Sequence, residues 1–150
     1  MPPERVNLPF KKAAHTEDIP VPRYMTDGSS GMDLCAAVTE NTLIQPGEVA
    51  LIPAGIMVAV PAGYELQIRP RSGLAAKKGI GILNSPGTID SDYRGEIKVI
   101  MINLGPEPFT VHRKDRIAQM VLCPVPQAVL EEMEELPPTG RSGGGFGHTG

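Results

Sequence analysis

One short polar segment holds the residues whose types are best suited to chemistry. Residues 87–97 read Gly-Thr-Ile-Asp-Ser-Asp-Tyr-Arg-Gly-Glu-Ile, so two carboxylates, a tyrosine and an arginine lie within five positions. Asp90 or Asp92 could take a proton from water, and Tyr93 could offer a flat face to a ring. An ordinary hairpin turn uses the same residue types, because Asp-Ser-Asp and Arg-Gly are common in turns. The segment alone therefore leaves a catalytic and a structural interpretation open.

Two strand-like runs enclose this segment and would hold it in place. Residues 80–83 are apolar and lead into the turn formers Asn84-Ser85-Pro86, while residues 97–103 are rich in β-branched side chains. We expect a polar loop pinned between two strands, which is a common way to place a catalytic acid or base on a rigid support.

The rest of the chain shows the same rhythm of short strands separated by Gly and Pro turns. This spacing predicts an all-β fold, namely a sandwich, a barrel or a jelly roll. One short helix is expected, with Ser72 as its cap, residues 74–78 as its body and Gly79 as its end. Residues 130–136 would add an acidic turn or an extended arm. The other predicted strands are residues 6–11, 33–37, 42–44, 48–52, 56–60, 64–69, 109–111 and 117–125.

Composition and charge exclude several functional classes. The chain has 150 residues with a formal net charge of -3, so no bulk basic field attracts nucleic acid. It has no apolar run long enough for a signal peptide or for a membrane span. Cys35 and Cys123 lie in apolar surroundings, and we expect both to be buried, reduced thiols. Together these features predict a cytoplasmic protein that binds neither nucleic acid nor a membrane.

The C-terminal segment differs in kind from the rest of the chain. Pro137-Pro138 marks a boundary between a domain at residues 1–136 and a flexible tail at residues 137–150, whose last ten residues contain five glycines. Such a tail buries too little apolar surface to fold alone, so it is either a disordered end or a lid that orders on a ligand. As a lid on a nucleotide, Arg141 could pair with a phosphate and Phe146 could cover a base.

Three further segments carry polar groups between small or apolar residues. Residues 31–36 place Asp33 among small neighbours, and residues 113–119 carry charge into a strand that ends in an amide. Residues 70–75 bring an arginine, a hydroxyl and a glycine N–H to the start of the predicted helix, where an anion is readily bound. Each segment is weak evidence alone, since an isolated aspartate is usually a turn or ladder residue.

Taken in this order, the five segments closely resemble the five motifs of the trimeric dUTPases, the dUTP nucleotidohydrolases. The resemblance runs through residues 31–150 and extends weakly upstream through residues 19–24. It implies a β-jelly roll in which three identical chains share three active sites. It also implies a Mg2+-dependent enzyme that hydrolyses dUTP to dUMP and pyrophosphate. Such an enzyme keeps uracil out of DNA and supplies dUMP for thymidylate synthesis.

The resemblance also implies roles for individual residues. Asp90 resembles the general base that activates water for attack on the α-phosphate, and Tyr93 resembles the residue that packs on the deoxyribose and excludes a 2′-hydroxyl. Asp33 resembles an acid that supports Mg2+ through water. The residues that resemble uracil-pocket residues are Asn84, Thr88, Ile89 and Lys98. Those that resemble phosphate ligands are Arg71, Ser72, Gly73 and Gln119, and in the tail Arg141 resembles the γ-phosphate clamp, Phe146 the uracil lid and Gly147 a residue closing around the phosphates.

The sequence departs from the family pattern at a few positions. Ser142 and His148 stand where the family often has Gly and Ser, and Lys114 precedes Asp115 where a Gly is common. Ser142 should cost the tail backbone freedom, and His148 would add a proton-dependent phosphate contact. None of these changes touches the proposed base, so they affect the expected γ-phosphate contacts rather than the reaction.

Two other functions fit part of the pattern. A dCTP deaminase of the same superfamily would share the fold, but its relatives place Trp where Tyr93 stands and use a glutamate base. A nucleotide-sensing module would bind dUTP and signal without turnover, but it would not need Asp90. The combination of Tyr93 with the Arg141–Phe146 tail therefore favours dUTP hydrolysis.

Overall fold

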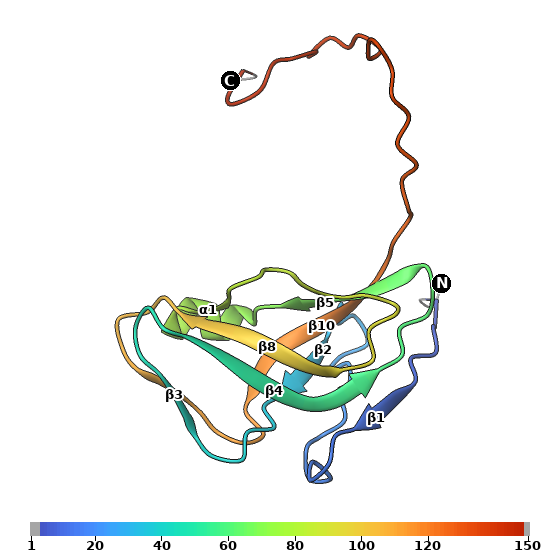
Figure 1. The fold of residues 1–150 in the computed structure, drawn as a ribbon. Coiled ribbons are helices and arrows are strands. Elements are labelled where there is room, and N and C mark those ends of the chain that lie inside the picture. Colours follow the sequence, from blue (N-terminus) through green and yellow to red (C-terminus); the bar gives the residue numbers. More distant parts are fainter. Residues whose placement is uncertain (1–3, 149–150) are drawn as a thin grey trace.

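Two four-stranded antiparallel sheets pack face to face in a jelly-roll-like β-sandwich (Figure 1). The structure, a computed structural model, describes residues 4–148, so the last two residues of the predicted tail lie outside the described part. The first sheet has the order β1(Phe10–Lys12), β4(Val49–Val58), β8(Glu96–Asn103), β6(Ile80–Ile82). The second has the order β2(Met32–Cys35), β10(Arg116–Pro124), β5(Tyr64–Arg69), β7(Gly87–Ile89), and β3(Thr42–Ile44) pairs with β9(Phe109–Val111).

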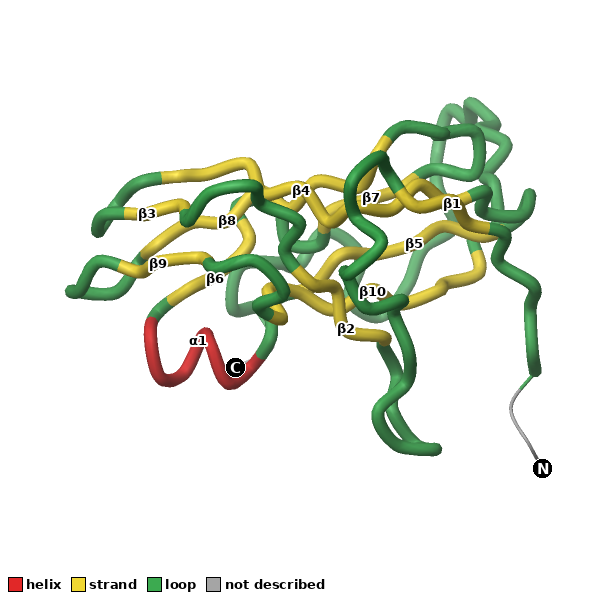
Figure 2. Tube along the Cα trace, turned by 90° about the horizontal axis from the view of Figure 1, so that it is seen from below, coloured by secondary structure: helices red, strands yellow, loops and turns green. Residues whose placement is uncertain are grey.

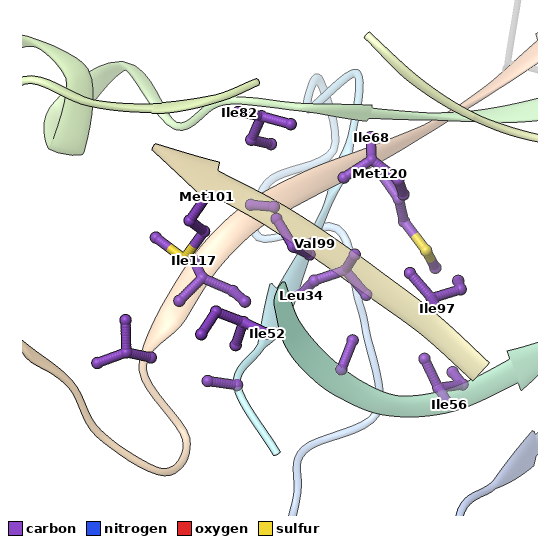
Figure 3. Close-up of a cluster of buried hydrophobic side chains, with 14 of the residues drawn as sticks. Leu34, Ile52, Ile56, Ile68, Ile82, Ile97, Val99, Met101, Ile117 and Met120 are labelled. Atoms are coloured by element: carbon purple, nitrogen blue, oxygen red, sulfur yellow. The ribbon is translucent and has the colours of Figure 1, made fainter. Parts of the chain in front are cut away.

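Aliphatic side chains from both sheets form the core between them. Along β8, every second residue from Ile97 onward is buried, and β5 buries Leu66 and Ile68 in the same alternating way. Figure 3 shows Ile97, Val99 and Met101 of β8 and Ile68 of β5 in one cluster with Leu34 of β2 and Ile52 of β4. Because strand side chains alternate between faces, the opposite faces of both sheets remain available for polar groups.

The predicted all-β fold with one short helix is confirmed. Helix α1(Ser72–Lys78), drawn red in Figure 2, packs beside β6 and ends at Gly79, whose φ of 68° is left-handed as a helix end favours. The predicted cap at Ser72 is wrong, because Ser72 is already helical. The extended residue before it is Arg71, and no side chain caps the helix.

Three predictions about single segments and one about a cysteine are also wrong. The turn expected at residues 53–55 is a bend inside β4, where the pairing with β8 shifts register between Pro53 and Met57 and Gly55 adopts a φ of 72°. Residues 87–89 are not loop but the edge strand β7, paired with β5. The first strand covers only Phe10–Lys12, and Cys123 is half-buried rather than buried.

The chain beyond β10 is extended and exposed. Residues 130–136 form neither helix nor strand, which agrees with the arm that was one of the two expectations for this segment. The arm carries the tail away from the sandwich (Figure 1). Between residues 4 and 148, no helix is both long and apolar enough to cross a membrane.

Candidate active site

A pocket of about 220 Å³ opens between the edges of the two sheets. Its walls come from β5 and β7 of one sheet and from β6 and β8 of the other, and three buried side chains of the core, Ile68, Ile82 and Val99, contribute to it. The structure brings six of the predicted site residues together in this pocket: Asn84, Thr88, Ile89, Asp90, Tyr93 and Lys98.

A short connection from β6 to β7 shapes one side of the pocket by crossing from the first sheet to the second. Ser85 Oγ donates a hydrogen bond to the carbonyl of Ile82 at 2.6 Å, which closes this turn. Gly87 follows, and a Cβ there would lie 3.3 Å from both Asn84 Nδ2 and Ile68 Cβ. The glycine thus lets the Asn84 amide lie close to the edge of β5, where it lines the pocket.

The turn from Asp90 to Glu96 shapes the opposite side and is held by its own hydrogen bonds. The backbone N–H of Tyr93 donates to the carbonyl of Asp90 at 3.2 Å, and Arg94 Nη1 donates to the carbonyl of Ser91 at 2.7 Å. Tyr93 Oη donates to the carbonyl of Glu96 at 3.0 Å, so the ring is fixed at its far end as well. The carboxylate of Asp90 lines the pocket and has no hydrogen-bond or ion-pair partner within residues 4–148. It is therefore free to accept a proton from a water molecule.

A second cluster of predicted residues centres on Asp33. Its carboxylate lies 3.4 Å from Arg71 Nε and 3.3 Å from Arg116 Nη1, and Arg71 Nη1 also donates to the backbone carbonyl of Arg116. Gln119 pairs with Asp33 across the strands, and its Nε2 donates to the carbonyl of Pro70 at 3.0 Å. Strand pairing between β2 and β10 therefore places the predicted phosphate and metal residues side by side. Ser72 and Gly73 lie exposed in the first turn of α1 next to them.

The pocket and the Asp33 cluster lie on opposite edges of the second sheet. Thr88 belongs to edge strand β7 and Asp33 to edge strand β2, with β5 and β10 between them. Three strand spacings separate the two edges, which is roughly 14 Å. Within one chain, the pocket and the arginine cluster are therefore held at different edges of this sheet.

The tail residues lie apart from both. Arg141, Phe146 and Gly147 sit at the end of the arm, and the Phe146 side chain is fully exposed. The hydrogen bonds of this segment are local, such as Arg141 Nε to the carbonyl of Gly144 at 2.6 Å. Ser142 stands where the family often has Gly, and its φ of 44° is in the left-handed region that favours glycine. The expected cost in backbone freedom therefore has a structural basis.

Sequence reasoning missed two groups next to the predicted residues. Glu96 lines the pocket, and its Oε1 accepts the N–H of Gly55 at 2.9 Å, which ties the pocket to the bend in β4. Arg116 is the second arginine on Asp33. Arg116 lies in the charged segment that ends in Gln119, so the sequence did indicate a functional segment there. Only the pairing of β10 with β2 shows that Arg116 contacts Asp33.

An arginine outside the pocket fastens the upstream segment to the turn before β10. Arg113 donates to both carboxylate oxygens of Asp18, at 2.6 and 3.0 Å, and to the carbonyls of His15 and Val38. This double hydrogen bond holds the pKa of the Asp18 carboxyl well below its usual range. Lys114, the neighbour that replaces a common Gly, has a φ of 72°.

The two cysteines are free and differ in environment. Cys35 is buried beside Asp33, and burial raises the pKa of its thiol, with the nearby carboxylate acting in the same direction. Cys123 is half-buried on β10, and Arg69 Nη2 lies 3.8 Å from its sulfur. Neither thiol lines the pocket that contains Asp90.

Comparison with known proteins identifies relatives along nearly the whole chain. The family model described as dUTPase matches residues 17–150. The deoxyuridine 5'-triphosphate nucleotidohydrolase of Caldanaerobacter subterraneus subsp. tengcongensis is 55% identical over 143 residues, covering 95% of this chain and 97% of the relative. The protein of the same description from Wolbachia pipientis wMel is 51% identical over 148 residues, covering 97% of each chain.

Solved structures share the fold at lower sequence identity. The dUTPase of Staphylococcus bacteriophage 80alpha with dUpNHpp superposes with a TM-score of 0.85 at 23% identity, covering 96% of this chain and 98% of the phage chain. A variant dUTPase from phage phi11 of S. aureus gives a TM-score of 0.77 at 22% identity over 87% of this chain and 98% of the phage chain. Its structure describes the coordination of a structural Mg(II) ion.

Proposed function

The chain belongs to the dUTPase family, and we propose that it hydrolyses dUTP to dUMP and pyrophosphate by attack of water on the α-phosphate. The observation that carries this proposal is the pocket in which Asn84, Tyr93 and an unpaired Asp90 carboxylate meet. The reaction removes dUTP, a source of uracil in DNA, and supplies dUMP for thymidylate synthesis. The free cysteines favour a cytoplasmic location for this activity.

Uracil and deoxyribose would occupy the pocket. A cavity of about 220 Å³ has room for a pyrimidine ring, and Asn84 offers both a donor and an acceptor to its polar edge. Thr88, Ile89 and Lys98 would line the same space. The flat ring of Tyr93 would pack on the deoxyribose and leave no room for a 2′-hydroxyl, so the pocket would select dUTP over UTP.

Asp90 would act as the general base. Its carboxylate faces the pocket and is not engaged by any cation between residues 4 and 148, which leaves it able to take a proton from water. Such assistance contributes about 10²–10⁴-fold to the rate. The rest must come from groups that hold the triphosphate in line and stabilise its charge.

A second copy of the chain would supply the phosphate-binding residues. The Asp33 cluster is roughly 14 Å from the pocket of its own chain, so its arginine and amide serve a neighbour's pocket more easily than their own. We therefore propose a homotrimer with shared active sites. Arg71, Ser72, Gly73 and Gln119 would bind phosphate oxygens there.

The tail would complete the site from a further copy. Residues 1–136 would form the catalytic domain and residues 137–150 a lid that orders on the nucleotide. Arg141 would pair with the γ-phosphate, Phe146 would cover the uracil and Gly147 would close around the phosphates. Arg141 and Phe146 are exposed, and Arg141 is hydrogen-bonded within the tail, so both side chains are available to a ligand.

The residues around Asp33 fit a Mg2+ ion that is contacted through water rather than one held directly by several protein ligands. No group of three or more His, Cys, Asp or Glu side chains within the described residues could hold a metal, and Asp33 already lies against two arginines. The chain thus fits an ion that arrives with the triphosphate and keeps most of its waters, with Asp33 contacting it through water. When bound, Mg2+ would neutralise phosphate charge and orient the oxygens.

Pyrophosphate release from dUTP, measured beside dTTP, dCTP and UTP, tests the proposed function. We expect turnover of dUTP with strong discrimination against the other three. Release of ammonia from dCTP would instead assign the deaminase reaction. Tight dUTP binding without any pyrophosphate release would assign the sensing role.

A further inference from the structure

Gly95 lies directly beneath the ring of Tyr93. A Cβ placed on Gly95 would lie 2.4 Å from Tyr93 Oη and 2.6 Å from Tyr93 Cζ, with Cε2 at 3.1 Å. Contacts of a Cβ atom shorter than 3.0 Å essentially never occur, so a side chain at position 95 and the present position of the ring are incompatible.

The backbone at position 95 gives no other reason for a glycine. Glycines such as Gly55 and Gly79 have left-handed φ values, which disfavour any side chain. Gly95 is not among them, so an L-residue can adopt its backbone conformation. The contact with Tyr93 is therefore the physical obstacle to a side chain there.

The ring that covers Gly95 is the one that lines the pocket. Its hydroxyl donates to the carbonyl of Glu96 at 3.0 Å, and its backbone N–H donates to the carbonyl of Asp90 at 3.2 Å. Tyr93 is 43% exposed, so part of its side chain already faces solvent, toward which the ring can turn. A methyl group at position 95 would break the hydroxyl contact and move the ring outward, toward solvent.

We propose that Gly95 is a specificity-determining position, because the space above it lets Tyr93 lie across the pocket where the sugar binds. This inference rests on the proposed function, since it assumes that Tyr93 discriminates deoxyribose from ribose. Gly95 is a positioning residue, which acts on the substrate only through the tyrosine ring. A side chain at position 95 would make room for a 2′-hydroxyl without altering any group that touches the substrate.

A double-mutant cycle tests the proposal with the ratio of kcat/KM for dUTP to kcat/KM for UTP. Gly95→Ala should lower this ratio by about tenfold or more, in the same direction as Tyr93→Ala. In the Tyr93→Ala background, Gly95→Ala should leave the ratio unchanged, because the ring that it displaces is absent. Gly81→Ala is the matched control, since its Cβ would meet only Ile102 Cγ2 at an ordinary 3.7 Å.

The chain also allows the ring to be observed directly. It has no Trp and three Tyr, so Tyr24→Phe combined with Tyr64→Phe leaves Tyr93 as the single fluorophore. Adding Gly95→Ala to this variant should increase quenching of Tyr93 by acrylamide, because the ring turns outward. If Gly95→Ala alone does not fold, the double variant with Tyr93→Ala should fold, since the contact is relieved.

Three results would overturn the proposal. The first is a dUTP-to-UTP ratio of kcat/KM that does not change in Gly95→Ala. The second is a fall of this ratio on adding Gly95→Ala to Tyr93→Ala that equals the fall in the native background. The third is a Gly95→Ala/Tyr93→Ala double variant that still fails to fold. A native chain that hydrolyses dUTP and UTP equally would instead refute the proposed function, so the two failures are distinguishable.

Discussion

The pocket around Asp90 and the tail around Arg141 are held in opposite ways. The pocket is lined by four strands. Ser85 closes the turn on one side of it, and hydrogen bonds from Tyr93 and Arg94 close the turn on the other side. Between Pro138 and His148, the hydrogen bonds of the tail join tail residues to one another, and Phe146 is fully exposed. With the roles proposed above, base recognition would be built before the substrate arrives, whereas the tail's grip on the phosphates would form on binding.

This difference has an energetic consequence. A preformed pocket pays no ordering cost when uracil enters, so its contacts count in full toward binding. Ordering the tail costs backbone and side-chain entropy, and only the contacts that it makes in the closed state offset that cost. The triphosphate, which carries most of the charge, provides such contacts for Arg141. The tail should consequently close on the deoxynucleoside triphosphate rather than on deoxyuridine alone.

The largest effect should come from removing the base in the preformed region. Asp90→Asn keeps the shape of the side chain but removes the proton acceptor, so kcat for dUTP should fall by about 10²–10⁴-fold with dUTP affinity nearly unchanged. Steady-state kinetics and equilibrium dUTP binding measure the two quantities. Asp92→Asn is the matched comparison, because Asp92 is the other carboxylate of the same turn: it shares a neighbouring hollow with Asp90 but does not line the pocket that holds Asn84 and Tyr93. A loss in Asp92→Asn with near-normal kcat in Asp90→Asn would move the base to Asp92.

Removing the flexible region should cost nearly as much activity but no stability. A chain ending at Pro138 loses Arg141 and Phe146, so most dUTP turnover should disappear. Its melting temperature should stay the same, because those side chains are exposed and contribute nothing to the core. Calorimetry and pyrophosphate release separate the two effects. A truncated chain that melts earlier would show that the tail packs on the fold after all.

Mixing the two damaged chains tests whether pocket and tail come from different subunits. In trimers formed by co-refolding equal amounts of the truncated chain and Asp90→Asn, a working site needs Asp90 from the first and a tail from the second. Each condition is met with a chance of about one half, so about a quarter of sites should work. Activity at the level of the two parents, with mixed trimers confirmed by native mass spectrometry, would contradict the shared site.

Six of the predicted site residues line one pocket because they are almost contiguous in the sequence. Asn84 and Lys98 enclose a segment in which turn formers and β-branched runs are easy to recognise, and the strands Tyr64–Arg69 and Phe109–Val111 were predicted to the residue for the same reason. The Asp33 cluster was harder, since Arg71 and Arg116 meet the carboxylate only through the pairing of distant strands. Its residues were predicted from the resemblance, but their mutual contacts were not.

The segments that were wrongly predicted are those where tertiary pairing overrides local preference. Pro53 and Gly55 are typical of a turn, yet pairing with β8 on one side and β1 on the other keeps the chain extended with a bend between them. Residues 87–89 contain a glycine and follow turn formers, so nothing local indicates the strand that they form with β5. The Gly95 contact also depends on where the Tyr93 ring lies, which no pattern contains.

A moderate effect is expected from the Asp18–Arg113 ion pair when the pH is lowered. The pKa of Asp18 is lowered in the folded state by Arg113, so the native carboxylate binds its proton less readily than the unfolded one. Its stabilising contribution is therefore present above the unfolded pKa and is lost as the pH falls below about 4. Arg113→Gln should flatten the acid side of the stability profile, measured by urea unfolding at several pH values. If the free energy of unfolding of Arg113→Gln falls with decreasing pH as steeply as that of the native chain, this pair is not the cause of the acid dependence. The chain ending at Pro138 should keep the native pH dependence.

The smallest effect compares one backbone position in each region. Lys114 and Ser142 are both non-glycine residues with left-handed φ values, 72° and 44°. Lys114 lies in the turn that positions Arg116, so Lys114→Gly should relieve strain and stabilise the fold by about 0.5–1 kcal/mol after the entropy cost of glycine is subtracted. Lys114→Ala removes the same ion pair with Asp18 but keeps the strain, so it is the control for the backbone effect.

Ser142→Gly should leave the urea midpoint unchanged, because the tail is outside the cooperative fold. It should act on dUTP turnover alone, by easing closure. A shift of the midpoint in Ser142→Gly as large as that in Lys114→Gly would mean that tail and body unfold together, and the contrast between a preformed pocket and a free lid would be wrong.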